Sequence, residues 1–222
     1  MMDLHIHIRD IINKINSFDE YINEECKNGV DKICFLEHGD RISEKHHGYL
    51  VDDESANVLK KIVENAKSKY PNLDIYNGIE LDYSMDTDFR NRTLDYLEKN
   101  NFDIVIGSIH CYKFNDGKDY FNSIIDMVNN YPIDIIGHIK LRENWREFVN
   151  IIEDIVRLCR QKNIKIEINT SDRSLWNEEQ FAFMTSLMKQ YNVDYTIGSD
   201  AHHLDEIGKN YELVKKRLDK NI

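Results

Sequence analysis

The sequence alternates short apolar runs, rich in isoleucine and valine, with longer amphipathic stretches. Fully buried strands of parallel sheets have this apolar character, and the intervening stretches show the spacing of helices that bury one face. Strict alternation of strand and helix predicts an α/β fold, with a parallel sheet and helices outside it. The seven runs span residues 1–7, 32–38, 74–82, 103–110, 133–138, 164–169 and 193–199.

Seven such units favour a distorted seven-stranded (β/α)7 barrel, similar to a TIM barrel, and leave an open doubly wound sheet as the alternative. Both architectures place their ligands at the carboxyl ends of the strands. We expect one domain over residues 1–222, because the chain has two prolines and no Pro/Gly-rich linker. Ser17 and Glu20 form the pattern of a capping box, and Asn177 and Gln180 are suited to cap a later helix.

Composition narrows the classes of function. The net charge of −11 argues against long nucleic acids as partners, because no basic stripe offsets it. No apolar run approaches the ~18 residues that a membrane span needs, and the first residues lack the basic leader and apolar stretch of a signal peptide. The four cysteines form no CxxC pair. We therefore expect a cytoplasmic protein with reduced thiols, no membrane partner and an oligomeric state that the sequence leaves open.

Polar residues recur where each predicted strand ends. The carboxyl ends of barrel strands share one face, so side chains far apart in the sequence are expected to converge there. His5 and His7 are two residues apart on one strand, and their side chains therefore point to the same side. The strand-end residues that we select as candidate metal ligands are His5, His7, His38, Glu80, His110, His138, Asp200 and His202.

Imidazole nitrogens combined with carboxylate oxygens suit zinc, manganese or iron. A carboxylate such as Glu80 can bridge two ions, and paired ions stabilise the attacking and leaving oxygens of a phosphoryl transfer. Any one of these histidines alone is better explained by a structural hydrogen bond. However, six of the nine histidines in the chain lie at predicted strand ends, and separate structural hydrogen bonds do not explain that concentration. We expect His46, His47 and His203 to be exposed or to support the ligands.

The motif order is specific to a known family. DLHIH, LEHG, GIELDYS, IGSIH, IIGH, EINTS and GSDAH follow one another from the first residues to about Gly208. This series resembles the polymerase and histidinol phosphatase (PHP) superfamily, and most closely its histidinol-phosphatase branch. The resemblance implies a distorted (β/α)7 barrel with two to three divalent metal ions at the carboxyl ends of the strands.

The resemblance also implies a set of ligands and a reaction. One ion would be held by His5, His7, Glu80 and Asp200. Glu80 would bridge to a second ion on His110 and His138, and a third would use His38 and His202. A metal-bridging hydroxide would attack the phosphate ester, which makes Glu80, Asp200 and His202 the expected catalytic residues. Two departures from the family concern Asn13, where a further histidine is usual, and Lys140, where an acid is often found.

The substrate is expected to be a small phosphate monoester. The favoured candidate is L-histidinol phosphate, an intermediate of histidine biosynthesis. Arg142 and Arg173 follow the fifth and sixth strand ends, and arginine offers a planar fork for phosphate. We predict that both bind the substrate. Glu167 and Asn169 have two equal interpretations, as partners that orient the ligand histidines or as strand-end residues bonded to the backbone.

Three alternatives remain. A PHP phosphoesterase of this kind would act instead on a nucleotide, a phosphotyrosine peptide or a phosphodiester. A non-catalytic member would bind metal for stability, or a phosphorylated ligand for regulation. A metal-dependent amidohydrolase barrel would use similar ligands, but it often adds a carboxylated lysine on a strand, and Lys140 lies beyond the strand end.

Overall fold

The computed structural model describes residues 1–39, 52–110 and 116–221. Within them, seven parallel strands form one sheet in the order of the sequence, and every neighbouring pair is parallel. The strands are β1 (Met2–His7), β2 (Lys32–Leu36), β3 (Asp74–Asp82), β4 (Ile104–Ser108), β5 (Ile135–Ile136), β6 (Lys165–Asn169) and β7 (Tyr195–Gly198).

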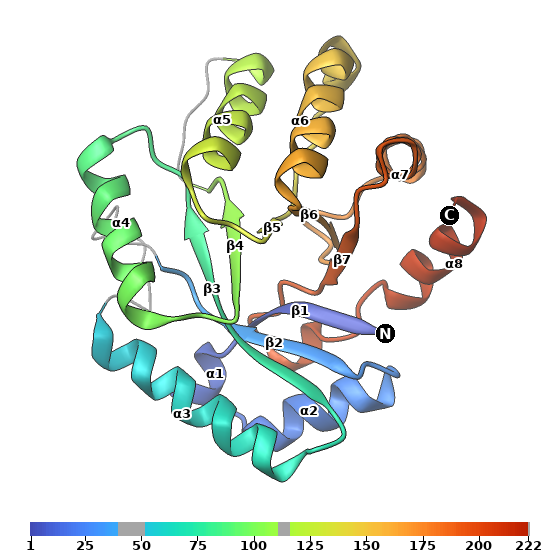
Figure 1. The fold of residues 1–222 in the computed structure, drawn as a ribbon. Coiled ribbons are helices and arrows are strands. Elements are labelled where there is room, and N and C mark those ends of the chain that lie inside the picture. The colour runs from blue at the N-terminus through green and yellow to red at the C-terminus, as the bar shows by residue number, and fades with distance from the viewer. Residues whose placement is uncertain (40–51, 111–115, 222) are drawn as a thin grey trace.

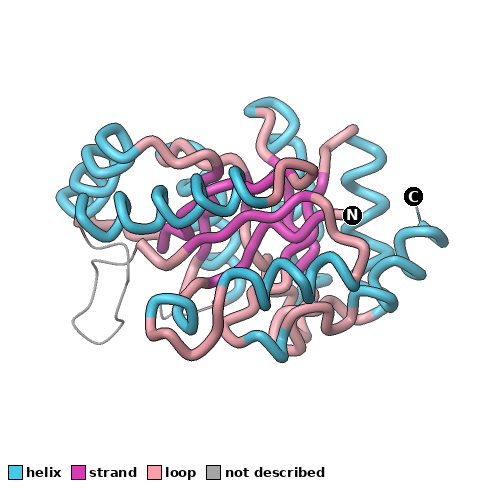
Figure 2. Tube along the Cα trace, turned by 90° about the horizontal axis from the view of Figure 1, so that it is seen from below, coloured by secondary structure: helices cyan, strands magenta, loops and turns pink. Residues whose placement is uncertain are grey.

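Helices surround this sheet, as Figure 1 and Figure 2 show. Their polar faces point to solvent and their apolar faces to the strands, as the amphipathic spacing predicts. They are α1 (Arg9–Ile12), α2 (Phe18–Lys27), α3 (Asp53–Lys69), α4 (Thr87–Asn100), α5 (Gly117–Asn130), α6 (Val149–Lys162), α7 (Glu178–Tyr191) and α8 (Tyr211–Asn221), with short 3-10 turns at Trp145–Phe148 and Leu204–Glu206.

The sheet curves until its first and last strands meet. Beyond the end of β7, Ala201 forms a parallel bridge with Ile6 of β1. The Asp200 N–H donates to the His5 carbonyl at 2.8 Å, and the His7 N–H donates to the Ala201 carbonyl at 2.9 Å. The predicted α/β barrel is therefore confirmed, nearly closed and with its seam between β1 and β7. The fifth strand is much shorter than its predicted run.

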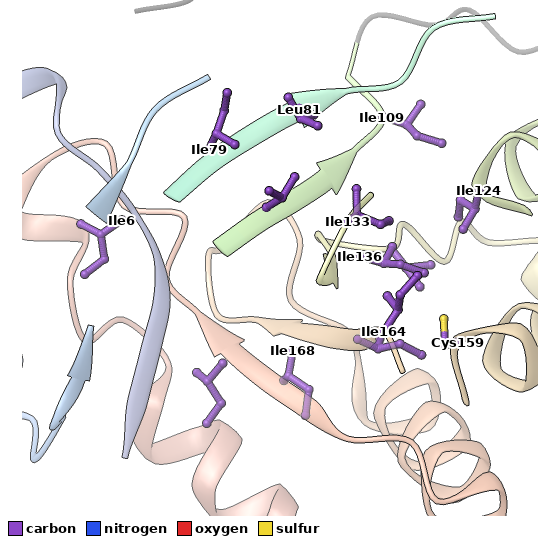
Figure 3. Close-up of a cluster of buried hydrophobic side chains, with 14 of the residues drawn as sticks. Ile6, Ile79, Leu81, Ile109, Ile124, Ile133, Ile136, Cys159, Ile164 and Ile168 are labelled. Atoms are coloured by element: carbon purple, nitrogen blue, oxygen red, sulfur yellow. The ribbon is translucent and has the colours of Figure 1, made fainter. Parts of the chain in front are cut away.

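Two apolar layers hold the barrel together. A small cluster inside the sheet is built only from strand side chains, among them Leu4, Cys34 and Ile106. A larger cluster fills the space between the strands and the helices. Figure 3 shows part of it, with Ile124 and Cys159 projecting from helices toward Ile136 and Ile164.

The predicted helix starts are found. The Ser17 hydroxyl accepts from the Glu20 N–H and the Glu20 carboxylate accepts from the Ser17 N–H, which is a complete capping box. Asn177 and Gln180 make the same reciprocal pair at the start of α7. In the part of the chain that the structure describes, no helix combines the length and apolar character that a membrane crossing requires.

Candidate metal centre

A β-bulge in β1 aims two histidines into the barrel. Asp3 pairs with Ile33 and Ile6 pairs with Phe35, so Leu4 and His5 together lie opposite the single residue Cys34. One extra residue moves each side chain beyond it to the opposite face of the sheet. Leu4 joins the cluster inside the sheet, and the imidazoles of His5 and His7 follow it inward, both fully buried.

Glu80 on β3 lies at the centre of the converging side chains and is fully buried. Its Oε2 is 2.9 Å from His38 Nδ1 and 3.5 Å from the Nε2 atoms of both His5 and His7. Its Oε1 is 3.0 Å from His138 Nε2 and 3.2 Å from His110 Nε2. The two oxygens of one carboxylate therefore face two different sets of imidazoles.

Asp200 completes the first set from the far end of the chain. Its Oδ1 is 3.4 Å from His7 Nε2 and 3.7 Å from His5 Nε2. Its φ of 54° lies in the left-handed region, which aspartate tolerates better than most residues. This turn at the barrel seam carries the chain from β7 to His202, whose Nδ1 donates to the Asp200 carbonyl at 3.0 Å.

The donor atoms are arranged as metal ligands would be. Among the described residues, the buried Nε2 atoms of His5 and His7 have no hydrogen-bond partner. Buried polar atoms without partners are costly, and a shared cation would satisfy all of them. Three groups of side chains each offer donor atoms within 4.8 Å of one another: His5–His7–Asp200, His38–Glu80–His110 and His7–His38–His202.

The electrostatics of the site favour positive charge. Burial raises the pKa of Glu80, but the neighbouring His110, His5 and His38 outweigh it and hold that pKa well below its usual range. Burial lowers the pKa of His7, yet the nearby carboxylates of Asp200 and Glu37 raise it to about 9. Burial and His7 lower the pKa of His202 to about 4, so its ring is neutral at neutral pH. The anionic carboxylates and imidazole nitrogens suit a divalent cation such as zinc, manganese or iron.

Buried carboxylates support the candidate ligands from behind. The Glu167 carboxylate lies 2.7 Å from His5 Nδ1. The Asp82 carboxylate accepts the backbone N–H of His110 at 2.7 Å. Such bonds fix the orientation of a ligand before any ion binds.

A model of the PHP domain family matches residues 3–171 of this chain. The chain belongs to the PHP family. A probable phosphatase of Thermoanaerobacter sp. (strain X514) is 25% identical over 97% of this chain and 84% of its own length. A probable histidinol-phosphatase of Clostridium acetobutylicum is 26% identical over 97% of this chain and 92% of its own length.

Among solved structures, histidinol phosphate phosphatase of Lactococcus lactis, complexed with zinc, L-histidinol and phosphate, matches with a TM-score of 0.73. The match is 22% identical and covers 97% of this chain and 93% of that chain, which shows the shared fold. The predicted PHP family, its histidinol-phosphatase-like branch and the enzyme class, a phosphoric monoester hydrolase, are confirmed by these comparisons.

A polar pocket of about 370 Å³ opens beside Asp200 and His202 in this PHP barrel. Arg173 lines it, where the sequence predicts a substrate-binding residue. Arg142 is exposed after β5 and is not among the described residues that line this pocket, so its role stays a prediction. The remaining lining residues are Arg9, Ser171, Asp172, Ser199, His203, Glu206 and Lys209.

The sequence did not predict that several of these residues line the site. Glu206 and Lys209 lie beyond the last strand end. Their closeness to Asp200 in the sequence is the one sequence feature that could have placed them near the site. His203 is exposed, and its Nδ1 bonds to the buried Asp10 carboxylate at 3.0 Å. Asn13 is exposed at the end of α1. His46 and His47 lie outside the described residues.

Proposed function

We propose that this PHP phosphatase hydrolyses a small phosphate monoester, with L-histidinol phosphate as the favoured substrate. One observation carries the proposal: the two carboxylate oxygens of Glu80 face separate sets of imidazoles, as a bridge between two cations requires. A bound pair of divalent ions supplies a nucleophile at neutral pH and stabilises charge on the attacking and leaving oxygens.

The side chains divide into sets around that bridge. His5, His7 and Asp200 would hold one ion with Glu80 Oε2, and this set includes the buried atoms without partners. On the Glu80 Oε1 side, His110 and His138 would hold the second. The stacked rings of His7 and His202, with centroids 3.9 Å apart, bring His202 close enough to His38 to form a third set.

The pocket supports a small polar substrate. Every described side chain that lines it is polar or charged. Arg173 offers a fork to the phosphate, and Asp172 and Glu206 offer carboxylates to a substrate amine. The side chain of Asp200 is 18% exposed and faces both the imidazoles and the pocket, so a substrate in the pocket would lie beside the first ligand set. The relative named a probable histidinol-phosphatase supports L-histidinol phosphate as the ester.

The test is phosphate release by protein that is first stripped with a chelator and then reloaded with zinc, manganese or no metal. We expect metal-dependent turnover, and a kcat/KM for L-histidinol phosphate at least about 100-fold above that for a nucleotide or a phosphotyrosine peptide. Asp200→Asn and His110→Ala should abolish turnover. Glu64→Gln, on the exposed surface of α3, should leave turnover unchanged. Full rates in the chelated protein would refute the proposal, and a flat substrate profile would refute the favoured ester.

A further inference from the structure

Behind His5, on the side away from Glu80, lies a second buried carboxylate. Glu167 on β6 is 1% exposed, and its Oε1 is 2.7 Å from His5 Nδ1. A carboxylate can only accept in this bond, so Nδ1 carries the hydrogen and Nε2 presents its lone pair. That Nε2 is the buried atom 3.5 Å from Glu80. Glu167 therefore selects both the tautomer and the ring orientation that ligation needs.

The other oxygen of Glu167 reaches a different part of the site. Its Oε2 accepts the backbone N–H of His138 at 2.6 Å and the Nδ2 amide of Asn169 at 3.2 Å. His5 faces one oxygen of Glu80, whereas His138 faces the other. One carboxylate thus fixes a ring in the first ligand set and the backbone beneath a ring in the second.

The neighbouring strand makes room for this arrangement. Gly198 on β7 is so close that an added Cβ would lie 2.1 Å from Glu167 Oε1 and 2.7 Å from the Cβ of His5. No side chain fits there unless Glu167 or β1 shifts. The glycine is thus explained by the position of the Glu167 carboxylate.

We propose that Glu167 is a positioning residue that aligns both halves of the metal centre, an inference that rests on the ligand sets of the proposed function. A glutamine would not replace it. Glu167 accepts from three donors with two oxygens, whereas a glutamine amide has one oxygen and would direct an NH₂ group toward another donor. A merely structural residue would support folding without changing how tightly the folded protein binds ions.

The experiment measures metal affinity rather than turnover. Zinc or manganese is titrated into chelator-stripped protein in competition with a chromophoric chelator, and the affinity and number of bound ions are recorded. Glu167→Gln should weaken the binding of both equivalents of metal, meaning the two ions on either side of Glu80, by about 10- to 100-fold. This is the range seen when partners of metal ligands are removed. Gly198→Ala should weaken them in the same direction, although it alters neither a ligand nor a carboxylate.

Three further proteins make the result decisive. Glu64→Gln repeats the chemical change on the surface and should bind ions like the parent. Asp82→Asn changes a buried carboxylate that contacts the backbone N–H and the ring of His110 and lies on that ligand's side of the site, so it should weaken one equivalent. Glu80→Gln removes the bridge itself. Circular dichroism of each metal-free variant restricts the comparison to folded protein, and Gly198→Ala carries the test if Glu167→Gln does not fold.

The outcomes separate the two proposals. Parent-like ion binding by Glu167→Gln or by folded Gly198→Ala, while Glu80→Gln loses its ions, would overturn the positioning role and leave the metal centre intact. Weakening of one equivalent only would overturn the link between the two halves. Parent-like binding by Glu80→Gln would overturn the metal centre, and with it the proposed function.

Discussion

At the scale of single residues, the site depends on where each charged group is held. Arg173 and Arg142 both follow strand ends, and the sequence alone ranks them equally. The structure separates them, because Arg173 lines the pocket beside Asp200 whereas Arg142 is exposed outside it among the described residues. The direction that a loop takes after its strand has no signature in a single sequence.

Arg173→Ala should therefore lower kcat/KM for L-histidinol phosphate by about 10- to 100-fold, the loss expected when a charged hydrogen bond of about 1.5–3 kcal/mol is removed. Arg142→Ala should change it by less than about 3-fold. Steady-state kinetics of the two variants provide the comparison. A larger effect at Arg142 would show that the phosphate enters from the other side.

A second residue-scale feature is a buried acid away from the metal centre. Glu25 on α2 is fully buried, and the Tyr211 hydroxyl lies 3.4 Å from its carboxylate and also bonds to Asp3. Burial, followed by the charge of Asp3, raises the pKa of Glu25 from 4.5 to about 10. The folded protein thus holds a proton on Glu25 that the unfolded chain releases above about pH 4.5.

Because the folded pKa is the higher one, the stability contribution of Glu25 is complete below the unfolded value and is lost as the pH rises toward 10. Glu25→Gln keeps a neutral group at every pH. The variant should gain stability relative to the parent between about pH 5 and pH 9, on the order of 1–3 kcal/mol. Denaturant unfolding across this range measures the difference, and a gain that shrinks with rising pH would contradict the assignment.

At the scale of elements, strand and helix positions follow from the sequence because their causes are local. Apolar runs and capping residues are visible in a few consecutive positions, and the strand-end histidines follow from them. The bulge at Leu4 and His5 has no such cause: its extra residue is recognised only against the partner strand β2. The bond between Glu167 and His5 joins residues 162 positions apart, so the two sequence interpretations of Glu167 remain equal until the fold is known.

Helix α2 provides the element-scale prediction. The Ser17 hydroxyl satisfies the Glu20 N–H at its start, and neither residue is among those that line the described pocket beside Asp200. Ser17→Ala should cost about 1 kcal/mol and lower Tm by about 2–4 °C. Turnover and ion binding at moderate temperature should be unchanged. Thermal unfolding measures the loss, and an unchanged Tm would mean that tertiary packing alone fixes this helix end.

At the scale of the whole molecule, the candidate ligands come from the ends of six strands. Ion binding therefore stabilises the folded barrel but not the unfolded chain, and the gain follows the ratio of free ion to dissociation constant. At 1,000-fold excess over that constant the gain is about 4 kcal/mol. Tm should rise with added zinc or manganese and fall after chelation, by calorimetry. In Glu80→Gln the dependence on metal should largely vanish, and a parent-like dependence there would place the stabilising ions elsewhere.

The seam between β1 and β7 joins two segments of which one is synthesised well before the other. His5 and His7 are made long before Asp200 and His202, because nearly the whole barrel separates the two pairs in the sequence. A polypeptide still attached to the ribosome, or one cut short by a premature stop codon before Asp200, lacks one side of the ion cage. We expect such fragments to release no phosphate at any metal concentration, so that hydrolysis begins only once translation has passed the seventh strand.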